Sequence, residues 1–477
     1  TLSLHDALPI STDTAGNPLS GVMSSGLNIG DLPMTFTFGS GSTTPTGSGT
    51  QNGPYIIDSF EDLRWISEDS SRWNKYYSQE EDIEAHPSRY MNDAGTDTST
   101  IEGFSPIGSE TVSFTGHYDG KGHSIYGLYI NRPTQNYVGL FGAVGNYIKL
   151  GGISIEGAFV IGNKYVGILA GSVNKPSNSN APAISHCHTN GIVMANMTGG
   201  GLIGWLTGST HLYKSSSHAT VYGYRQSVTG GNTVNDGSKL GGLVGKIQAP
   251  YSPNSSIQYC YATGTVSGTE KIGGFVGDIG TNGEIIKSYA MGSVWGSSSN
   301  IGGFVGYDNS RNDGRKYTFS TGYVSGGSNA TNIGGASGGK DSNTNGSNNF
   351  WNTQTSSKTS SAGTSGGREV GKTTSQLMDR YTYSSWPDFD NHFIFSGNLN
   401  HGYPALRTNN DIELIDISFN PQTSQVSIVI NDSDIDVVPE LALSILSDQN
   451  SSVISISSVS ISITTSSFVT DITLIAL

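Results

Sequence analysis

The sequence predicts an all-β protein, a parallel β-solenoid with small capping elements, followed by a truncated immunoglobulin-like β-sandwich. Three observations predict this architecture. A glycine-containing phrase recurs about every 30 residues, a second phrase lies between its copies, and an alternating apolar pattern begins after residue 410. The winding is expected to be right-handed, because right-handed crossovers dominate in parallel sheets.

The first phrase ends in a glycine and marks successive repeat units. Its copies are YVGLFG (137–142), YVGILAG (165–171), GGGLIG (199–204), LGGLVG (240–245), IGGFVG (272–277), IGGFVG (301–306) and the degenerate IGGASG (333–338). Their closing glycines are separated by 29, 33, 41, 32, 29 and 32 residues. A β-propeller is the less favoured alternative, because each of its blades needs about 40 residues and four strands.

The second phrase falls at a fixed place between copies of the first. It reads ISHCHTNGIV (184–193), IQYCYATGTVSG (257–268), IKSYAMGSVWG (286–296) and YTFSTGYVSG (317–326). Runs such as GGFVG are too short and too rich in glycine for a helix, and the glycines are expected to allow positive φ at corners. Units of this kind bury their apolar side chains only when they stack about 4.8 Å apart.

Stacking predicts two aliphatic ladders inside the solenoid. The first ladder is predicted to contain Leu140, Ile168, Leu202, Leu243, Phe275 and Phe304. The second is predicted to contain Val193, Val266, Val294 and Val324.

These phrases resemble the GLUG motif, which occurs in tandem in bacterial surface proteins. That family includes adhesin-like chains and the non-catalytic regions of IgA-specific metallopeptidases. The resemblance covers about residues 55–406, including GFSPIGS near the start and FWNTQTS, GKTTSQL and HGYPAL near the end. It implies a solenoid on the cell surface and says little about activity. Two departures are an insertion in the 41-residue unit and the loss of the large apolar residue in IGGASG.

The flanking segments have distinct compositions. Residues 1–10 resemble one reading frame of a sequencing adapter, and residues 11–54 are interpreted as a Ser/Thr/Gly-rich linker. The capping region is expected at 55–100, with a helix over 58–68, and the solenoid at 101–350. A C-terminal cap with a short helix near 374–381 is expected at 351–409, and a partial sandwich at 410–477. The chain is therefore expected to be a fragment of a longer, exported protein.

The charge balance excludes some classes of partner. The 24 Lys and Arg against 38 Asp and Glu give a net charge of −14, and only 13% of residues are charged. No positive field is available to attract nucleic acid or anionic lipid. No apolar run approaches the ~20 residues of a membrane-spanning helix.

Two cysteines and their neighbours are the nearest approach to a metal site. Internal alignment makes Cys187 equivalent to Cys260, and His186 and His188 equivalent to Tyr259 and Tyr261. Aromatic residues in place of histidines favour packing, so no metal or other cofactor is expected. With one unit between them, the cysteines should lie two rungs apart, about 9–10 Å, which is beyond the ~7 Å limit for a disulfide. Both are predicted to be buried free thiols.

A sequence that satisfies the P-loop pattern lies at residues 366–373. A phosphate-binding loop needs a buried strand before it and a helix after it. The preceding SSKTSSAGTSG predicts no strand, so nucleotide binding is not expected.

The positions just after the closing glycines predict an exposed column. They vary where the ladder positions do not, and four of them are candidate ligand-binding residues: Trp205, Lys246, Asp278 and Tyr307. Glycans or host and cell-surface proteins are the expected partners. Asp278 and Asp308 could lie one rung apart, as a paired-carboxylate enzyme would need, but the favoured interpretation is that both are solvated turn residues. No catalytic residues are assigned.

The sequence therefore favours an exported surface protein whose solenoid serves as a rigid stalk or display platform for adhesion. One alternative is a carbohydrate-active β-helix enzyme, either a lyase or a hydrolase. Another is the accessory region of a secreted peptidase, although none of the ten histidines lies in an HExxH motif.

Overall fold

The computed structural model describes residues 44–407, together with the backbone of four strands between 414 and 474. Within the first range it leaves out residues 92–100, 147, 176–182, 224–236, 249–254, 311–313, 341–345, 365–368 and 396–399. The adapter-like segment 1–10 and most of the predicted linker lie outside the described residues. So does most of the insertion in the 41-residue unit.

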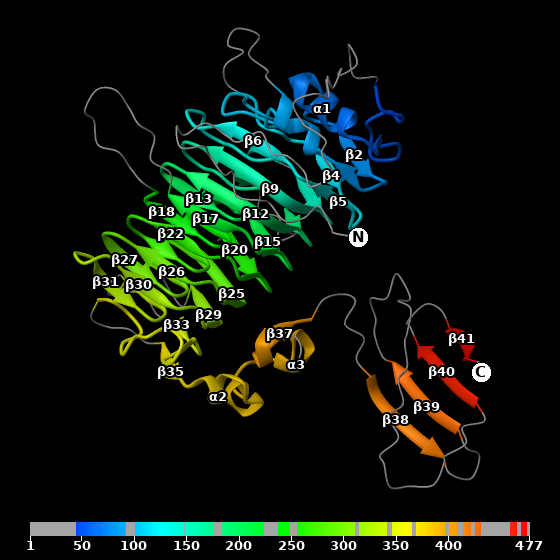
Figure 1. Ribbon diagram of the computed structural model, residues 1–477. Helices are drawn as coiled ribbons and strands as arrows, with labels where there is room; N and C mark the ends of the chain where they lie inside the picture. The colour runs from blue at the N-terminus through cyan, green and yellow to red at the C-terminus, as the bar shows by residue number, and fades with distance from the viewer. Residues whose placement is uncertain are drawn as a thin grey trace, which may run out of the picture.

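The chain winds into a column of parallel strands, each paired with the strands one coil before and one coil after it (Figure 1). The first ladder contains β1 (Tyr55–Ile57), β2 (Tyr76–Gln79), β4 (His117–Asp119), β8 (Lys149–Gly151), β11 (Ile184–Ser185), β15 (His211–Tyr213), β20 (Ser255–Gln258), β25 (Gly283–Ala290), β29 (Arg315–Ser320) and β33 (Gly346–Ser347). It begins with β1 and β2, so two coils of the ladder lie within the range predicted as a cap.

Two further ladders follow the first one around the coil. One contains β3 (Ile83–Glu84), β5 (Ser124–Tyr126), β9 (Ser154–Gly162), β12 (His188–Ala195), β16 (Ser216–Ser217), β21 (Tyr261–Ala262), β25, β29, β34 (Phe350–Asn352) and β35 (Val370–Lys372). The other contains β6 (Tyr129–Arg132), β9, β12, β17 (Thr220–Gly223), β22 (Val266–Gly268), β26 (Val294–Gly296) and β30 (Val324–Gly326). Both consist entirely of parallel pairs.

The recurring glycine phrase forms the remaining two ladders. Its first half supplies β13 (Thr198–Gly200), β18 (Lys239–Gly241), β23 (Ile272–Gly273), β27 (Ser299–Gly302) and β31 (Thr331–Gly334). Its end supplies β7 (Phe141–Val144), β10 (Ala170–Lys175), β14 (Ile203–Gly208), β19 (Val244–Gln248), β24 (Val276–Ile279), β28 (Val305–Asp308) and β32 (Ser337–Lys340). The parallel β-solenoid is therefore confirmed, while its winding sense stays a prediction.

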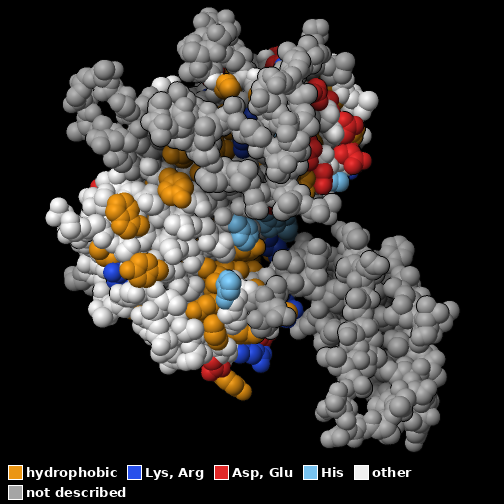
Figure 2. Space-filling model, viewed as in Figure 1, with side chains coloured by type: hydrophobic (Ala, Val, Ile, Leu, Met, Phe, Trp, Pro, Cys, Tyr) orange, Lys and Arg blue, Asp and Glu red, His pale blue; other side chains and the backbone are white. Residues whose placement is uncertain are grey.

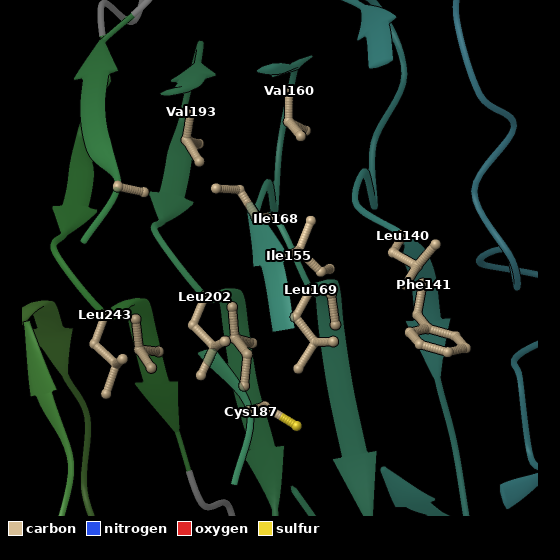
Figure 3. Close-up of a cluster of buried hydrophobic side chains, with 14 of the residues drawn as sticks. Leu140, Phe141, Ile155, Val160, Ile168, Leu169, Cys187, Val193, Leu202 and Leu243 are labelled. Carbon is tan, nitrogen blue, oxygen red and sulfur yellow. The ribbon is translucent and has the colours of Figure 1, made fainter. Parts of the chain in front are cut away.

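The first apolar ladder runs through the core with one correction. The register pairs Phe141 with Ala170 and Ala170 with Ile203, so Leu169, not Ile168, is the ladder partner of Leu140 and Leu202. YVGILAG has one residue more than YVGLFG before its closing glycine, and this residue shifts the register by one. Figure 3 shows Leu169, Leu202 and Leu243 in one row, with Ile168 apart from it but also buried.

The later coils continue the same core. Phe275 and Phe304 follow Leu243 in the ladder, and their rings stack with centroids 4.7 Å apart. The second predicted ladder is confirmed, because Val193, Val266, Val294 and Val324 are buried in register, joined by Val160 and Val221.

The glycines of the recurring phrase are required by the close approach of neighbouring backbones. A Cβ on Gly277 would lie 2.6 Å from the backbone nitrogen of Leu240, and one on Gly306 would lie 2.3 Å from the carbonyl carbon of Lys271. A Cβ on Gly242 would likewise lie 2.2 Å from the carbonyl oxygen of Gly274 in the next coil. No real side chain tolerates such distances, so only glycine fits at these positions.

The corners that need positive φ are built mostly from other residues, so the expected role of glycine there is wrong for this phrase. The corner residues that begin the phrase or directly precede it include Tyr137, Tyr165, Lys271, Asn300 and Asn332, with φ of 60°, 60°, 52°, 60° and 55°. Neighbouring coils support this conformation, as where the Asn332 side-chain amide donates to Asn300 Oδ1 over 3.2 Å. Asparagine is also among the residues that adopt this region most readily.

The cysteines lie as predicted, two rungs apart with Ser215 between them. The backbone nitrogen of Cys187 donates to Ser215 Oγ over 3.1 Å, and the backbone nitrogen of Ser215 donates to Cys260 Sγ over 3.4 Å. Both thiols are free and fully buried, and burial raises the pKa of each to about 12.

The predicted N-terminal helix is present as α1 (Phe60–Glu68). Ser59 Oγ accepts from the backbone nitrogen of Asp62 and caps the helix. Phe60, Leu63 and Ile66 are buried against the core. Two short 3-10 helices follow, η2 (Ser70–Arg72) and η3 (His86–Tyr90). Within the described part of the chain, no helix is both long enough and apolar enough to cross a bilayer.

The region predicted as the C-terminal cap forms a second apolar cluster on the outside of the solenoid. Its elements are α2 (Thr374–Leu377), η4 (Arg380–Tyr383), α3 (Phe389–His392), η5 (Asn400–Gly402) and the antiparallel pair β36 (Phe393–Ile394) and β37 (Ala405–Leu406). They pack on a ladder of outward rings formed by Tyr289, Phe319 and Phe350. Phe350 stacks on Trp386 with centroids 5.7 Å apart.

The predicted sandwich after residue 410 is not shown. The described strands there are β38 (Leu414–Asn420), β39 (Gln425–Ile430), β40 (Ser458–Thr464) and β41 (Val469–Leu474), and they form a single sheet in this order. The central pair β39–β40 is parallel, whereas neighbours within an immunoglobulin sheet run antiparallel. The alternating pattern predicted strands correctly, but it does not determine how they pair.

We expect Gly306→Ala to lower the free energy of unfolding by at least ~2 kcal/mol, because its methyl group would overlap backbone atoms of the preceding coil. Gly327→Ala is the control, since a Cβ there meets its nearest atom at an ordinary 3.4 Å. Chemical denaturation followed by circular dichroism measures both. Equal stability of the two variants would contradict the close-approach explanation.

We also expect Cys187 and Cys260 to stay unmodified when the native protein is treated with iodoacetamide, because both thiols are buried and protonated. Both should react after denaturation in the absence of a reductant. Peptide mass spectrometry measures the labelling, and a disulfide-linked pair of peptides would contradict the one-coil-per-unit register.

Candidate binding surface on the solenoid

The four residues predicted as an exposed column lie in register on the outward side of one ladder. Trp205 on β14 pairs with Lys246 on β19, Lys246 with Asp278 on β24, and Asp278 with Tyr307 on β28. Successive members of a parallel ladder lie about 4.8 Å apart. The structure therefore brings the four side chains together in one row, while their role in binding stays a prediction.

The row itself continues from Trp205 to Ser172 and Ala143. Two tyrosines that were missed in the sequence pack against its Trp205 end from another register position. Tyr165 stacks on Trp205 with centroids 4.5 Å apart, and Tyr137 lies against Tyr165 at 5.1 Å. Lys246 Nζ lies 5.9 Å from the centre of the Trp205 ring. The sequence contained a signal for these two tyrosines, because each is the first residue of its copy of the glycine phrase. We call Tyr137, Tyr165, Trp205, Lys246, Asp278 and Tyr307 the column.

Charges in the column are partly neutralised by neighbouring charged side chains. Asp278 is only 7% exposed and accepts from Lys271 Nζ over 3.2 Å, while the same ammonium lies 4.6 Å from the Tyr307 ring centre. Burial lowers the pKa of Lys246, and the nearby Asp278 carboxylate opposes this effect. Trp205, Lys246 and Tyr307 are half-buried, while Tyr165, at 8% exposed, and Asp278 are buried, so the column is more enclosed than the sequence predicted.

Other exposed aromatic residues, also missed in the sequence, lie on a different side of the coil. Trp295 on β26 is 42% exposed, Tyr222 on β17 is 41% exposed, and the two share a register position two rungs apart through Ser267. Tyr323 is 51% exposed beside β30. They provide a comparison for any test of the column.

Asp308 does not face Asp278, so the considered carboxylate pair is wrong. Asp308 aligns with Ile279 in the ladder, one position past the column, and points to the core. It is fully buried, accepts from Ser310 Oγ over 2.6 Å and lies 3.4 Å from Arg315 Nε. The interpretation of Asp308 as a solvated turn acid is also wrong, because its carboxylate belongs to a buried ion cluster.

This ion cluster fills the C-terminal end of the core. Arg315 and Glu369 are ion-paired, Ser337 Oγ donates to Glu369 over 2.7 Å, and Lys340 Nζ lies 3.8 Å from the same carboxylate. Burial alone would raise the pKa of Glu369, but the positive charges of Arg315 and Lys340 and the Ser337 hydrogen bond lower it to about 2. The cluster holds Glu369, which precedes β35, against the last coils.

The residues around Cys187 make a packing arrangement. His188 pairs with Ser216 and Ser216 with Tyr261, which confirms the internal alignment, and His188 Nδ1 lies 2.8 Å from Ser216 Oγ. Burial, with nearby His186 and His218, lowers the pKa of His188 to about 4. Among the described residues, no group of three or more His, Cys, Asp or Glu is placed to hold a metal ion.

The P-loop-like sequence does not form a loop before a long helix in its described part. Lys372 belongs to strand β35, and Thr373 caps α2, which has only four residues. The first three residues of the pattern, 366–368, lie outside the described residues.

Parts of the sequence are similar to two curated proteins. Over 175 residues, 36% of this chain, the sequence is 36% identical to Halomucin of Haloquadratum walsbyi, and this match covers 2% of that protein. Over 114 residues, 24% of this chain, it is 30% identical to the "Putative Gly-rich membrane protein" of Evansella cellulosilytica, covering 12% of that protein. The matches thus span a small part of each relative.

Comparison of structures gives a further match. A crystal structure of "a putative immunoglobulin A1 protease" from Bacteroides ovatus aligns with a TM-score of 0.45 and 19% identity, covering 76% of this chain and 94% of that chain. No family model matches the sequence.

We expect Glu369→Gln to lower the free energy of unfolding by about 3 kcal/mol at pH 7, because it leaves Arg315 and Lys340 under-compensated in the core. Since folding lowers the pKa of Glu369 to about 2, its contribution is complete above pH ~4.5 and is lost as the pH falls from there toward 2. Denaturation measured between pH 3 and 7 should therefore show the difference between variant and parent shrinking in acid.

Glu81→Gln is the matched control, because that side chain is exposed and the change should stay within ~0.5 kcal/mol. A pH-independent difference for Glu369→Gln would show that charge is not the cause of its stabilisation.

Proposed function

We propose that this chain is part of an extracellular or surface protein, and that its solenoid serves as a rigid stalk or display platform for adhesion. The single observation that carries the proposal is the continuous parallel solenoid. Seven in-register strands of one of its ladders hold outward side chains in a fixed row. A parallel ladder with a packed core holds such a row rigidly, which suits spacing and contact.

The surface chemistry supports contact with extended, uncharged partners. Figure 2 shows a middle stretch of the solenoid that is largely free of charged side chains, with separate apolar patches, whereas acidic side chains gather toward the N-terminal end. The similarity to Halomucin and to a protein named as a membrane protein is consistent with a place at or outside the cell surface. We also propose that the chain belongs with the GLUG-motif surface proteins, whose phrases its repeat resembles.

The column is proposed as the contact surface, with glycans or cell-surface proteins as partners. Trp205, supported from behind by the buried Tyr165, offers an aromatic ring, Lys246 offers a donor, and Tyr307 adds a further ring at the other end. Aromatic rings flanked by a few polar groups suit both sugars and protein surfaces, because each ring supplies a large area at a small entropic cost.

We expect Trp205→Ala to weaken binding on a glycan or host-protein array by about tenfold, because one central aromatic contact is removed. Trp295→Ala is the matched control, since it removes a ring of the same size from another side of the coil. Loss of binding with Trp295→Ala and retention with Trp205→Ala would remove the column from consideration. Circular dichroism checks that both variants are folded.

A further inference from the structure

A groove of about 490 Å³ lies on the outward side of β2, β4, β8 and β11, near the N-terminal end of the solenoid. Its floor is the first ladder, in which Tyr76, His117 and Lys149 share one outward register position. The residues between the outward positions, such as Tyr118 and Leu150, are buried in the core. The groove is therefore fixed by the coil itself.

The groove is open because Gly151 leaves a gap in the second outward row. Asp119 pairs with Gly151 and Gly151 with Ser185, so Asp119 and Ser185 stand two rungs apart, about 9–10 Å, with no side chain between them. A Cβ on Gly151 would meet its nearest atoms at 3.7 and 3.8 Å, both in Ser185, and no positive φ requires glycine there. Unlike the glycines of the recurring phrase, Gly151 is not required by the backbone.

An aromatic pair forms one wall of the groove. Tyr76 and His117 stack with centroids 4.4 Å apart and planes at 19°, and both side chains are partly exposed. The pair lines the groove together with Gly151 and offers the flat face of an aromatic ring there. Such a face packs well against the C–H side of a pyranose ring, which is apolar and flat in the same way.

Hydrogen-bond donors and acceptors surround this face. Asp119 and Lys149 are exposed and of opposite charge, and Lys121 Nζ already donates to Glu80 over 2.6 Å. His186 Nε2 is buried without a hydrogen-bond partner among the described residues. Burial, with nearby Lys214, lowers the pKa of His186, so its ring is neutral at pH 7. The lining thus offers acceptors and donors with little net charge.

We propose that this groove binds a short stretch of neutral oligosaccharide, with one sugar ring in the gap above Gly151 and against His117. Sugar hydroxyls donate and accept, which matches Asp119, Lys149 and His186 around an apolar face. A volume of this size is typical of small-ligand sites. A peptide added as a strand is disfavoured, because β2, β4 and β8 are paired on both edges and offer no free backbone.

The groove and the column occupy different ladders of the coil. The groove belongs to the ladder of β4 and β8, and the column to that of β14 and β19. Binding in the groove is therefore independent of the adhesive role proposed for the column, and each can fail alone.

Titration of the full chain with cellohexaose, mannohexaose and xylohexaose, followed by saturation-transfer-difference NMR and calorimetry, tests the groove. We expect one of these neutral hexaoses to bind. Gly151→Val fills the gap with a side chain suited to a strand and should abolish binding, whereas Gly327→Val, at a similarly open glycine far along the chain, should leave it unchanged. His117→Ala should weaken binding about tenfold.

The outcomes separate the two sites. If Gly151→Val abolishes hexaose binding and Trp205→Ala retains it, the result supports the groove. If Trp205→Ala abolishes binding and Gly151→Val retains it, the groove proposal is overturned, while the proposal for the column stands. The proposal is overturned if none of the three hexaoses binds. It is also overturned if only a galacturonate hexamer binds and this binding is lost with Lys149→Ala but kept with His117→Ala, because the groove would then bind an anionic sugar through charge. Circular dichroism shows whether each variant remains folded.

Discussion

The close approach of backbones between successive coils is the constraint on which this structure depends. The coils can stack in register only where the backbone of one coil passes within van der Waals contact of the next, and a Cβ at Gly274 or Gly306 would lie 2.2–2.3 Å from backbone atoms of the neighbouring coil. Because glycine has no Cβ, the phrase that recurs in the sequence is the part of the coil where contact is tightest. The apolar ladders then fill the interior that this stacking encloses.

In-register stacking also determines what the surface can do. Each outward position repeats about every 4.8 Å along the axis, so a change of residue type from one coil to the next becomes a change along a straight row. The column has rings at both ends and charges between them, while the first ladder has a ring pair followed by the gap at Gly151. A ligand with a regular repeat of its own is therefore the class of partner that this surface can follow over several coils.

The sequence was sufficient for the coil and for the row of Trp205, Lys246, Asp278 and Tyr307, because both follow from one repeated spacing. The sequence was insufficient to predict a residue's position where one extra residue alters the spacing, or where the side chain's contact partner is distant in the sequence. One extra residue before Gly171 moved Leu169 into the ladder, and Asp308 turned inward because Arg315, which is also paired with Glu369, meets it there. The groove was also beyond prediction, since Tyr76 and His117 come together only through a register that spans 41 residues.

The two ends of the solenoid are closed by different chemistry, and the difference has a physical reason. At the N-terminal end, α1 covers the core with Phe60, Leu63 and Ile66. Apolar contact of this kind is favourable but non-directional, so it does not fix the exact position of each side chain. At the C-terminal end, Glu369 must reach Arg315 and Ser337 at defined points, because a buried carboxylate without these partners would be costly. Glu369 is therefore held in one place, β35 continues from it in register with β34, and the outer cluster around Phe350 and Trp386 is built on the strand so positioned.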